Sequence, residues 1–267
     1  MAQSEKYKQK YEKAIEMHNN GFTFKEIYKT LKMDRQILRR NMEYDKIFIY
    51  NQNNDKYRNK SCFQTINTEE KAYWLGFLYA DGYVSEKENK VELTSKDFSH
   101  IKKFKDFVNV QNTIRTKKAM GNDYYRISFR DKKITEDLVK KGCFQNKSLS
   151  LRFPTLKVVP LHLQRHFIKG YFDGDGCVGI YKYNRNGYER TNIVTIIIGT
   201  KPFLNKLIKV ANLDHNIYSA KGRAFEWRSG KKSTVKGFLD YIYKDSLVYL
   251  DRKYEKYLQI AVLDGNI

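Results

Sequence analysis

The sequence predicts an α+β protein, in which a small helical module precedes two related units of helices and short strands. Two observations support this fold class. The first 45 residues carry apolar side chains at helical spacing, with basic side chains between them. The chain beyond residue 67 contains a diverged internal repeat, and each copy joins a helical segment to alternating, strand-like segments. We therefore expect residues 1–45 to form one domain, residues 46–67 a linker, and residues 68–158 and 159–267 the two repeat units.

The charge of the chain indicates the kind of partner that it binds. Its 267 residues include 51 Lys and Arg against 30 Asp and Glu, which leaves a net charge of +21. Such an excess favours a polyanion, either nucleic acid or an anionic membrane surface. No apolar run reaches the roughly 20 residues of a membrane span, and the N-terminus lacks the apolar core of a signal peptide. We expect a soluble, intracellular protein that binds nucleic acid and no membrane.

The cysteines argue against two other classes of site. Cys62, Cys143 and Cys177 are odd in number and widely separated, and none belongs to a CxxC pair. Neither a disulfide framework nor a zinc site is therefore indicated.

Three helices are expected in the N-terminal module. Helical spacing runs from Tyr7 to Asn19 and ends at Gly21. Thr23 and Glu26 have the spacing of a capping box, which predicts a second helix. Asp34 is a suitable N-cap for a third helix after a short turn.

The third helix decides how this module is interpreted. Its predicted apolar positions are Ile37, Leu38 and Met42. Its polar face carries basic and amide side chains, namely Arg35, Gln36, Arg39 and Arg40. A helix-turn-helix that reads DNA has this layout, with the basic side chains on the recognition helix. The alternative is a plain three-helix cap that packs against the rest of the protein.

The internal repeat pairs the segment Tyr73–Val84 with the segment Phe167–Val178. Four positions are identical in both copies at one constant offset: Gly76 and Gly170, Asp81 and Asp175, Gly82 and Gly176, and Val84 and Val178. The downstream elements repeat as well: a strand at Val91–Thr94 or Val194–Ile197, then a basic helix at Ile101–Val108 or Phe203–Val210. Two further short strands and another helix complete each unit.

The segment before each repeated aspartate is expected to be a helix. Asn67 or Thr68 can cap the first helix, and Pro160 is a natural start for the second. Gly76 and Gly170 belong to stripes of small residues at a spacing of four, which allow two helix backbones to approach closely. If the stripes face each other, the helix ends coincide and the two aspartates meet.

Asp81 and Asp175 would then form a metal site. Two carboxylates at one point repel each other unless a cation joins them. Their hard oxygen ligands suit Mg²⁺, which also binds phosphate oxygens and supports phosphodiester hydrolysis. Asp173 has Tyr79 as its counterpart, and we expect it to be a helix-end residue, or one that supports the ligands, rather than a ligand. One Asp-Gly alone is typical of a turn, but two copies in matching contexts favour a functional site.

The segments WLGFLYADG and IKGYFDGDG resemble the paired motif of the LAGLIDADG homing endonucleases. The resemblance covers about Thr68 to Leu263. It implies two αββαββα units around a pseudo-twofold axis, with sheets that form a saddle over the major groove of double-stranded DNA. It also implies an enzyme that uses Mg²⁺ (or Mn²⁺) to cut both strands of a long target site, leaving short 3′ overhangs. Because both halves lie in one chain, we expect the active species to be a monomer.

The resemblance assigns metal-binding roles to particular residues. The last aspartate of each motif is the essential metal ligand in this family, which corresponds to Asp81 and Asp175. The carbonyls of the preceding residues, here Ala80 and Gly174, would also face the metals.

Three further catalytic residues follow from the resemblance. A basic residue late in each unit lies near the scissile phosphate, and the candidates are Lys147 and Lys253. A polar residue on the second strand often orients water, and the candidate is Glu92. The counterpart of Glu92 in the second unit is Thr195 or Ile196.

Three functional classes remain open on such a fold. The first is a site-specific endonuclease, and the second is an RNA maturase that binds intron RNA, because basic charge does not separate RNA from DNA. The third is a non-cleaving DNA-binding regulator. Retention of both motif acids favours cleavage. Contacts to base edges would come from alternate residues of the saddle strands, around 87–94, 113–129, 182–196 and 219–228.

Overall fold

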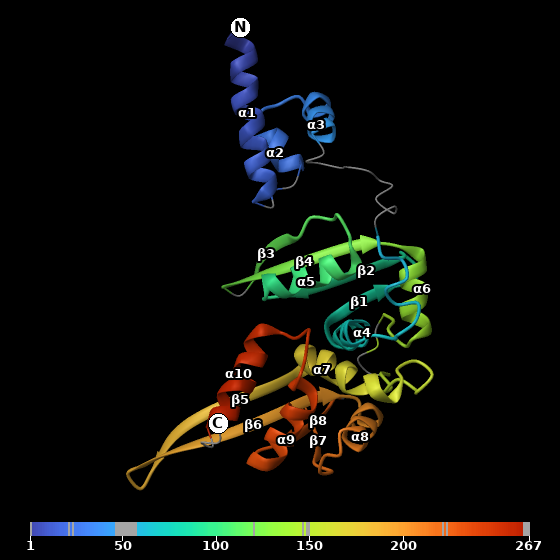
Figure 1. The fold of residues 1–267 in the computed structure, drawn as a ribbon, viewed down its shortest axis with the longest axis vertical. Coiled ribbons are helices and arrows are strands. Elements are labelled where there is room, and N and C mark those ends of the chain that lie inside the picture. Colours follow the sequence, from blue (N-terminus) through green and yellow to red (C-terminus); the bar gives the residue numbers. More distant parts are fainter. Residues whose placement is uncertain are drawn as a thin grey trace. The chain divides into compact units, whose positions relative to one another are not determined.

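A computed structural model describes residues 2–20, 22, 24–45, 58–119, 121–145, 147, 150–220, 222 and 224–263. The chain divides into two compact units. The first combines Met1–Asn59 with Thr94–Phe129, and the second combines Lys60–Leu93 with Arg130–Ile267. Figure 1 shows the course of the chain.

The N-terminal module contains α1 (Ala2–Asn19), α2 (Phe24–Thr30) and α3 (Arg35–Tyr44). Its buried core consists of Ala14, Ile27, Leu31, Met33, Leu38 and Met42. Asp34 caps α3 as expected, because its Oδ1 atom accepts hydrogen bonds from the backbone N–H groups of the second and third helical residues, both at 2.9 Å. The predicted helix stop at Gly21 and the capping Thr23 lie outside the described residues.

One apolar position of α3 differs from the prediction. Leu38 and Met42 are fully buried, but the Ile37 side chain is 47% exposed. Residues 38 and 42 lie one turn apart on one face of the helix, whereas residue 37 is rotated by about 100° from residue 38. The interpretation of Ile37 as a core residue is therefore wrong.

The repeat gives two series of elements in the same order. The first series is α4 (Glu69–Asp81), β1 (Gly82–Ser85), β2 (Lys90–Ser95), α5 (Phe98–Val108), β3 (Arg115–Ala119), β4 (Asn122–Arg130) and α6 (Lys132–Lys140). The second series is α7 (Gln164–Asp175), β5 (Gly176–Arg185), β6 (Tyr188–Gly199), α8 (Lys201–Val210), β7 (Ile217–Ser219), β8 (Phe225–Ser229) and α9 (Lys232–Tyr243). The strands form two four-stranded sheets, ordered β1-β2-β4-β3 and β5-β6-β8-β7. The pairs β1–β2, β3–β4, β5–β6, β6–β8 and β7–β8 are antiparallel, and the α+β class is confirmed.

The starts of the motif helices differ in detail from the prediction. Thr68, rather than Asn67, caps α4, because its hydroxyl oxygen accepts a hydrogen bond from the Lys71 N–H at 3.2 Å. Pro160 precedes the 3₁₀ turn η3 (Leu161–Leu163), and α7 begins only at Gln164. The carbonyl of Pro160 accepts the Leu163 N–H at 2.9 Å, which closes this tighter turn first.

Two further features were not anticipated from the sequence. A separate helix, α10 (Asp251–Val262), follows α9. In addition, the segment 58–67, which ends the predicted linker, contains the fully buried side chains of Cys62 and Phe63.

In the second sheet, alternate residues face the helices and the open side. Val178, Ile197 and Trp227 are buried, and the Trp227 ring packs against Phe238 of α9 with the ring centroids 5.6 Å apart. The open side of the same sheet carries Cys177, Tyr181 and further exposed residues. The helices therefore cover one face of this sheet and leave the other face exposed.

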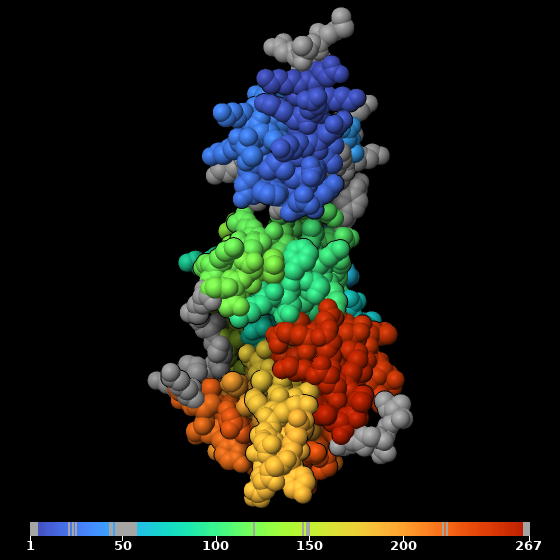
Figure 2. Space-filling model, turned by 90° about the vertical axis from the view of Figure 1, so that its left-hand side faces the viewer, coloured from blue at the N-terminus to red at the C-terminus, as the bar shows by residue number. Residues whose placement is uncertain are grey.

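The hairpins that follow the two motif aspartates differ in length. Strands β1 and β2 pair at four positions, whereas β5 and β6 pair at ten. Asn186 and Gly187 have φ angles of 53° and 79°, which fits the two-residue turn typical of a tight hairpin. On the face shown in Figure 2, this hairpin (yellow) lies beside α10 (red), and the Lys256 ammonium donates to the Val178 carbonyl at 2.9 Å.

Candidate active site

The motif helices α4 and α7 touch through their glycines. A Cβ atom on Gly76 would lie 2.0 Å from the carbonyl oxygen of Phe167, and one on Gly170 would lie 1.9 Å from that of Tyr73. Phe167 and Tyr73 are equivalent positions of the repeat, so the contact is reciprocal. The two backbones therefore meet directly at these positions, and any side chain here would push the helices apart.

This packing brings together the C-terminal ends of the two helices, which are Asp81 and Asp175. A Cβ atom on Gly174 would lie 2.3 Å from the Ala80 Cβ and 3.5 Å from Oδ2 of Asp81. The Asp81 side chain is exposed and the Asp175 side chain is half-buried. Two carboxylates thus lie close together at a place that solvent can reach.

The electrostatics reflect this proximity. Partial removal from water raises the pKa of Asp81, and the charges of Lys253 and Lys147 oppose that rise. Burial, followed by the negative charge of Asp81, raises the pKa of Asp175 to about 6. Ionisation of Asp175 is therefore opposed by its burial and by the charge of Asp81, whereas ionisation of Asp81 is opposed by its removal from water.

Lys147 and Lys253 are buried side chains that donate to backbone carbonyls. The Lys147 ammonium donates to the carbonyl of Gly82 at 2.5 Å. The Lys253 ammonium donates to the equivalent carbonyl of Gly176 at 2.5 Å, and also to those of Phe172 and Asp173 at 2.5 and 2.8 Å. Burial lowers the pKa of Lys253 to about 8. Both lysines therefore support the chain around the helix end that carries an aspartate.

Asp173 is a buried residue with three donors. It accepts hydrogen bonds from the hydroxyls of Tyr73 and Tyr243, at 2.7 and 2.5 Å, and from the Leu250 N–H at 2.8 Å. Its side chain is 1% exposed, and burial raises its pKa. Its position is that of a structural residue that joins α7 to α4 and to the start of α10.

Glu92 lies on β2, where it pairs with Tyr83 of β1. Strand β1 directly follows the motif helix of the first unit. Its carboxylate forms an ion pair with Lys90 at 2.9 Å. In the second hairpin Cys177 is the equivalent of Tyr83, and it pairs with Ile196. Ile196 is therefore the counterpart of Glu92. Thr195 is buried and donates to the Cys177 carbonyl at 3.0 Å.

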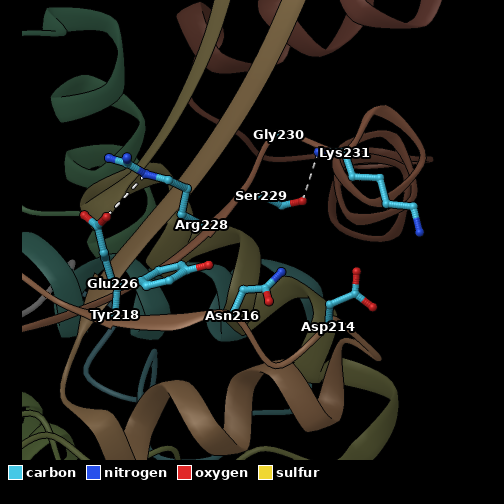
Figure 3. Close-up of a pocket in the computed structure, with 8 residues that line it drawn as sticks. All are labelled: Asp214, Asn216, Tyr218, Glu226, Arg228, Ser229, Gly230 and Lys231. Carbon is cyan, nitrogen blue, oxygen red and sulfur yellow. Dashed lines mark hydrogen bonds and ion pairs between the residues drawn. The ribbon is translucent and has the colours of Figure 1, made fainter.

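Candidate DNA contacts are exposed. In α3 the side chains of Arg35, Gln36, Arg39 and Arg40 are all exposed. In the second sheet, a pocket of about 370 Å³ does not include Asp81 or Asp175. It is lined by Asp214, Asn216, Tyr218, Glu226, Arg228, Ser229, Gly230 and Lys231. Figure 3 shows the Arg228 guanidinium turned toward Glu226, with a distance of 3.3 Å between nitrogen and oxygen. The pocket combines hydrogen-bond donors and acceptors on the open side of the sheet.

One polar cluster at the motif helices was not predicted from the sequence. Glu69, in the first turn of α4, accepts a hydrogen bond from the Lys169 ammonium at 2.7 Å. Lys169 is fully buried. A lysine within the second motif helix was the feature of the sequence that could have indicated a buried acidic partner. No sequence spacing relates two residues on helices so far apart in the chain, so Glu69 could not have been identified as the partner of Lys169.

The described residues contain neither a candidate membrane span nor a cluster of three acidic, His or Cys side chains. No helix there is long and apolar enough to cross a membrane. That part of the chain also holds no group of three His, Cys, Asp or Glu side chains arranged to bind a metal. The carboxylates at the ends of α4 and α7 are those of Asp81 and Asp175.

Comparison with known proteins identifies the fold. Residues 68–141 match the model of the LAGLIDADG-like domain. The structure is similar to the I-LtrWI LAGLIDADG homing endonuclease bound to target DNA, with a TM-score of 0.52 and 12% identity over 74% of this chain and 92% of that chain. It is also similar to I-SmaMI bound to an uncleaved DNA target in the presence of calcium ions, with a TM-score of 0.53 and 14% identity over 75% of this chain and 92% of that chain.

A sequence relative points to a much larger protein. The replication factor C small subunit of Methanocaldococcus jannaschii is 30% identical over 121 residues, which are 43% of this chain and 6% of that protein. The chain therefore spans only a small part of this relative. The described fold and the family match agree: the chain contains a LAGLIDADG-like domain and has the fold of the LAGLIDADG homing endonucleases.

Proposed function

We propose that this chain is a site-specific endonuclease that hydrolyses both strands of DNA at the paired aspartates Asp81 and Asp175. The observation that carries the proposal is the reciprocal glycine contact, which packs the two motif helices together so that their C-terminal ends lie close to each other. Two similar solved structures are homing endonucleases bound to DNA, and a net charge of +21 suits that partner. Retention of both acids favours cleavage over an RNA maturase or a non-cleaving regulator.

The donor set fits a divalent cation. The charge of Asp81 contributes to raising the pKa of Asp175, and this repulsion is what a bound cation would relieve. Asp81 and Asp175, with the carbonyls of Ala80 and Gly174, would hold Mg²⁺ or Mn²⁺. When bound, such an ion supplies Lewis-acid activation of water and neutralisation of phosphate charge.

The surrounding residues of the chain would prepare the site for this chemistry. The charges of Lys147 and Lys253 oppose the rise in the pKa of both aspartates. They therefore favour the ionised carboxylates that bind a cation. Their hydrogen bonds to the carbonyls of Gly82 and Gly176 fix the chain just after each aspartate. Lys253 uses three donors on backbone carbonyls, so its primary role is to hold this geometry rather than to contact phosphate. Glu92 would orient water in the first unit.

The open sheet faces would contact the duplex. In the β5–β6 hairpin, one face continues past the sheet and carries Tyr181, Tyr183, Arg185, Tyr188, Arg190 and Asn192. A two-stranded ribbon fits the major groove, and arginine can contact phosphate or read guanine. The pocket around Arg228 offers further donors and acceptors on the same sheet.

The N-terminal module would extend the recognised site as a helix-turn-helix. Arg35, Gln36, Arg39 and Arg40 would contact phosphates and base edges. Removal of residues 1–45 should then weaken binding and shorten the protected footprint at one end. It should also reduce the slope of log affinity against log salt by about two to four. A footprint of unchanged length would show that the module only packs against the protein.

A cleavage selection on a randomised DNA library with Mg²⁺ tests the main proposal. We expect a monomer to recover a defined long target, cut with short 3′ overhangs. The same preparation with EDTA, and an Asp81→Asn variant, serve as controls. Binding to DNA or intron RNA without cleavage under all metal conditions would reject the endonuclease and favour one of the two other classes.

A further inference from the structure

A second polar cluster lies toward the N-terminal ends of the motif helices. Glu69 and His166 lie in the first turns of α4 and α7, and Lys169 lies one turn further along α7. Oε1 of Glu69 accepts hydrogen bonds from the Lys169 ammonium at 2.7 Å and from the Leu247 N–H at 3.0 Å. Nδ1 of His166 lies 3.2 Å from the same oxygen. The Glu69 side chain is 16% exposed and the Lys169 side chain is fully buried. One carboxylate oxygen on α4 thus joins α7 to the loop between α9 and α10.

Glu69 and Lys169 form a buried ion pair. Although burial alone would raise the pKa of Glu69, the hydrogen bond and charge of Lys169 bring that pKa below its ordinary value. Burial lowers the pKa of His166 to about 4, so this imidazole is neutral at physiological pH. Lys169 also lies 5.6 Å from the centroid of the Tyr73 ring. The cluster is therefore a buried ion pair whose acidic member has a third partner in the loop.

That loop leads directly to Lys253. Three residues after Leu247, the Leu250 N–H donates to Asp173 at 2.8 Å, and α10 begins at Asp251. Lys253 lies in the first turn of α10 and donates to three carbonyls at the end of α7. The loop is thus held by one carboxylate from each motif helix.

We propose that Glu69 is a positioning residue, which fixes the α9–α10 loop so that Lys253 reaches the carbonyls around the Asp175 end of α7. This inference rests on the endonuclease function proposed above. Glu69 acts at a distance, because it lies at the opposite end of α4 from Asp81. Its hydrogen bond to Leu247, rather than its charge, is the part that serves catalysis.

Two double variants separate this role from simple stabilisation. Glu69→Gln with Lys169→Met removes the buried charges but keeps a carbonyl oxygen for the Leu247 N–H. Glu69→Leu with Lys169→Met also removes the charges, and it removes the acceptor as well. Neither variant leaves a buried unpaired charge, which is the usual reason why single changes in such a pair unfold a protein. Glu70→Gln, at the exposed neighbour of Glu69, is the matched control.

We expect the Gln double variant and the control to cleave DNA within about threefold of the unaltered protein. The Leu double variant should lose about tenfold in kcat with KM and DNA affinity unchanged, which corresponds to one lost positioning contact. Equal kcat values for the Gln and Leu double variants would overturn the proposal, whatever their thermal stabilities.

Amide hydrogen exchange provides a readout that does not depend on cleavage. The Leu double variant should lose protection at Leu247, Leu250 and the first turn of α10, while the Gln double variant keeps it. Unchanged protection in the Leu variant would overturn the positioning role even if the endonuclease function holds. If the Leu variant does not fold, Leu247→Pro removes the same hydrogen bond from the donor side and leaves Glu69 and Lys169 paired. A Leu247→Pro protein with full kcat would then reject the proposal.

Discussion

Two residues before its motif aspartate, the first repeat unit has Tyr79 and the second has Asp173. The Tyr79 hydroxyl donates to the Lys141 carbonyl, while Asp173 accepts from the Leu250 N–H. Both contacts tie the end of a motif helix to the segment that leads to a buried lysine, Lys147 or Lys253. The two units therefore reach a similar arrangement with unrelated chemistry.

At the helix interface the two units do not differ in this way. Gly76 faces the backbone of Phe167, Gly170 faces the backbone of Tyr73, and the contact repeats under exchange of the units. A direct contact between backbones admits only glycine, whereas an anchor needs only one donor and one acceptor. The comparison indicates that the interface constrains the sequence more tightly than the supports around the aspartates.

The largest effect is expected at this interface. Gly76→Ala or Gly170→Ala should destabilise the protein by about 3 kcal/mol or more, because a Cβ at either position meets backbone that cannot rotate away. Denaturant unfolding measures the change. Gly237→Ala in α9 is the control, since a Cβ there meets nothing within 4 Å and the added methyl should raise stability by up to about 1 kcal/mol. Equal tolerance at all three sites would contradict the close packing.

The next largest loss of stability is expected when the hydrogen bonds of Asp173 and Tyr79 are removed. Asp173→Asn should lower the free energy of unfolding by about 2 kcal/mol, because one amide oxygen cannot accept hydrogen bonds from all three donors that bind the carboxylate. Tyr79→Phe should cost about 1 kcal/mol, since it removes one hydrogen bond. Cleavage by Asp173→Asn, measured on refolded protein, should fall much less than cleavage by Asp175→Asn. If Asp173 proves as essential as Asp175, the choice of ligand is wrong.

The raised pKa of Asp175 predicts a stability effect in metal-free buffer. Its pKa rises from 3.8 to about 6 on folding, so ionised Asp175 destabilises the folded state above pH 6, and this cost disappears as the pH falls toward 4. Asp175→Asn should therefore stabilise the protein at pH 8, by about 1–2 kcal/mol after allowance for solvent screening of a half-buried group.

Thermal unfolding in EDTA at pH 8, 6 and 4 checks this prediction. The gain should shrink as the pH is lowered, and Asp81→Asn should show the same sign. If the stabilisation by Asp175→Asn instead grew toward pH 4, the destabilisation could not come from the ionised carboxylate.

The smallest effect concerns the unequal hairpins. Deletion of residues 182–185 and 188–191 keeps the Asn186-Gly187 turn and removes four of the ten paired positions of β5 and β6. Four positions span about 13 Å, so the protected footprint should shorten by about four base pairs at one end only. Lys182→Ala with Glu189→Ala removes the exposed ion pair on the other face of the hairpin and should leave the footprint unchanged. A footprint that shortens at both ends would contradict the prediction that the long β5–β6 hairpin extends the contact with DNA at one end only.

Much of the fold and the position of the aspartates could be predicted because the relevant signals are local or repeated. Alternation identified Val91–Thr94 as a strand, and the constant offset separated Asp175 from Asp173. What the sequence did not provide depends on contacts between distant segments. Asp173 meets Tyr73, Tyr243 and Leu250 only after the helices pack. Ile37 was misplaced because helical spacing alone does not say how wide the buried face of α3 is.

A double-mutant cycle on DNA cleavage tests most directly whether Asp81 and Asp175 form one shared site. Asp81→Asn and Asp175→Asn should each reduce the rate with Mg²⁺ about a thousandfold, with DNA binding largely intact. If the two carboxylates act as a unit, the double variant should also lose about a thousandfold to ten-thousandfold. Two independent contributions would instead multiply to about a millionfold. That result, or a single variant that still cuts both strands at the full rate, would contradict the account.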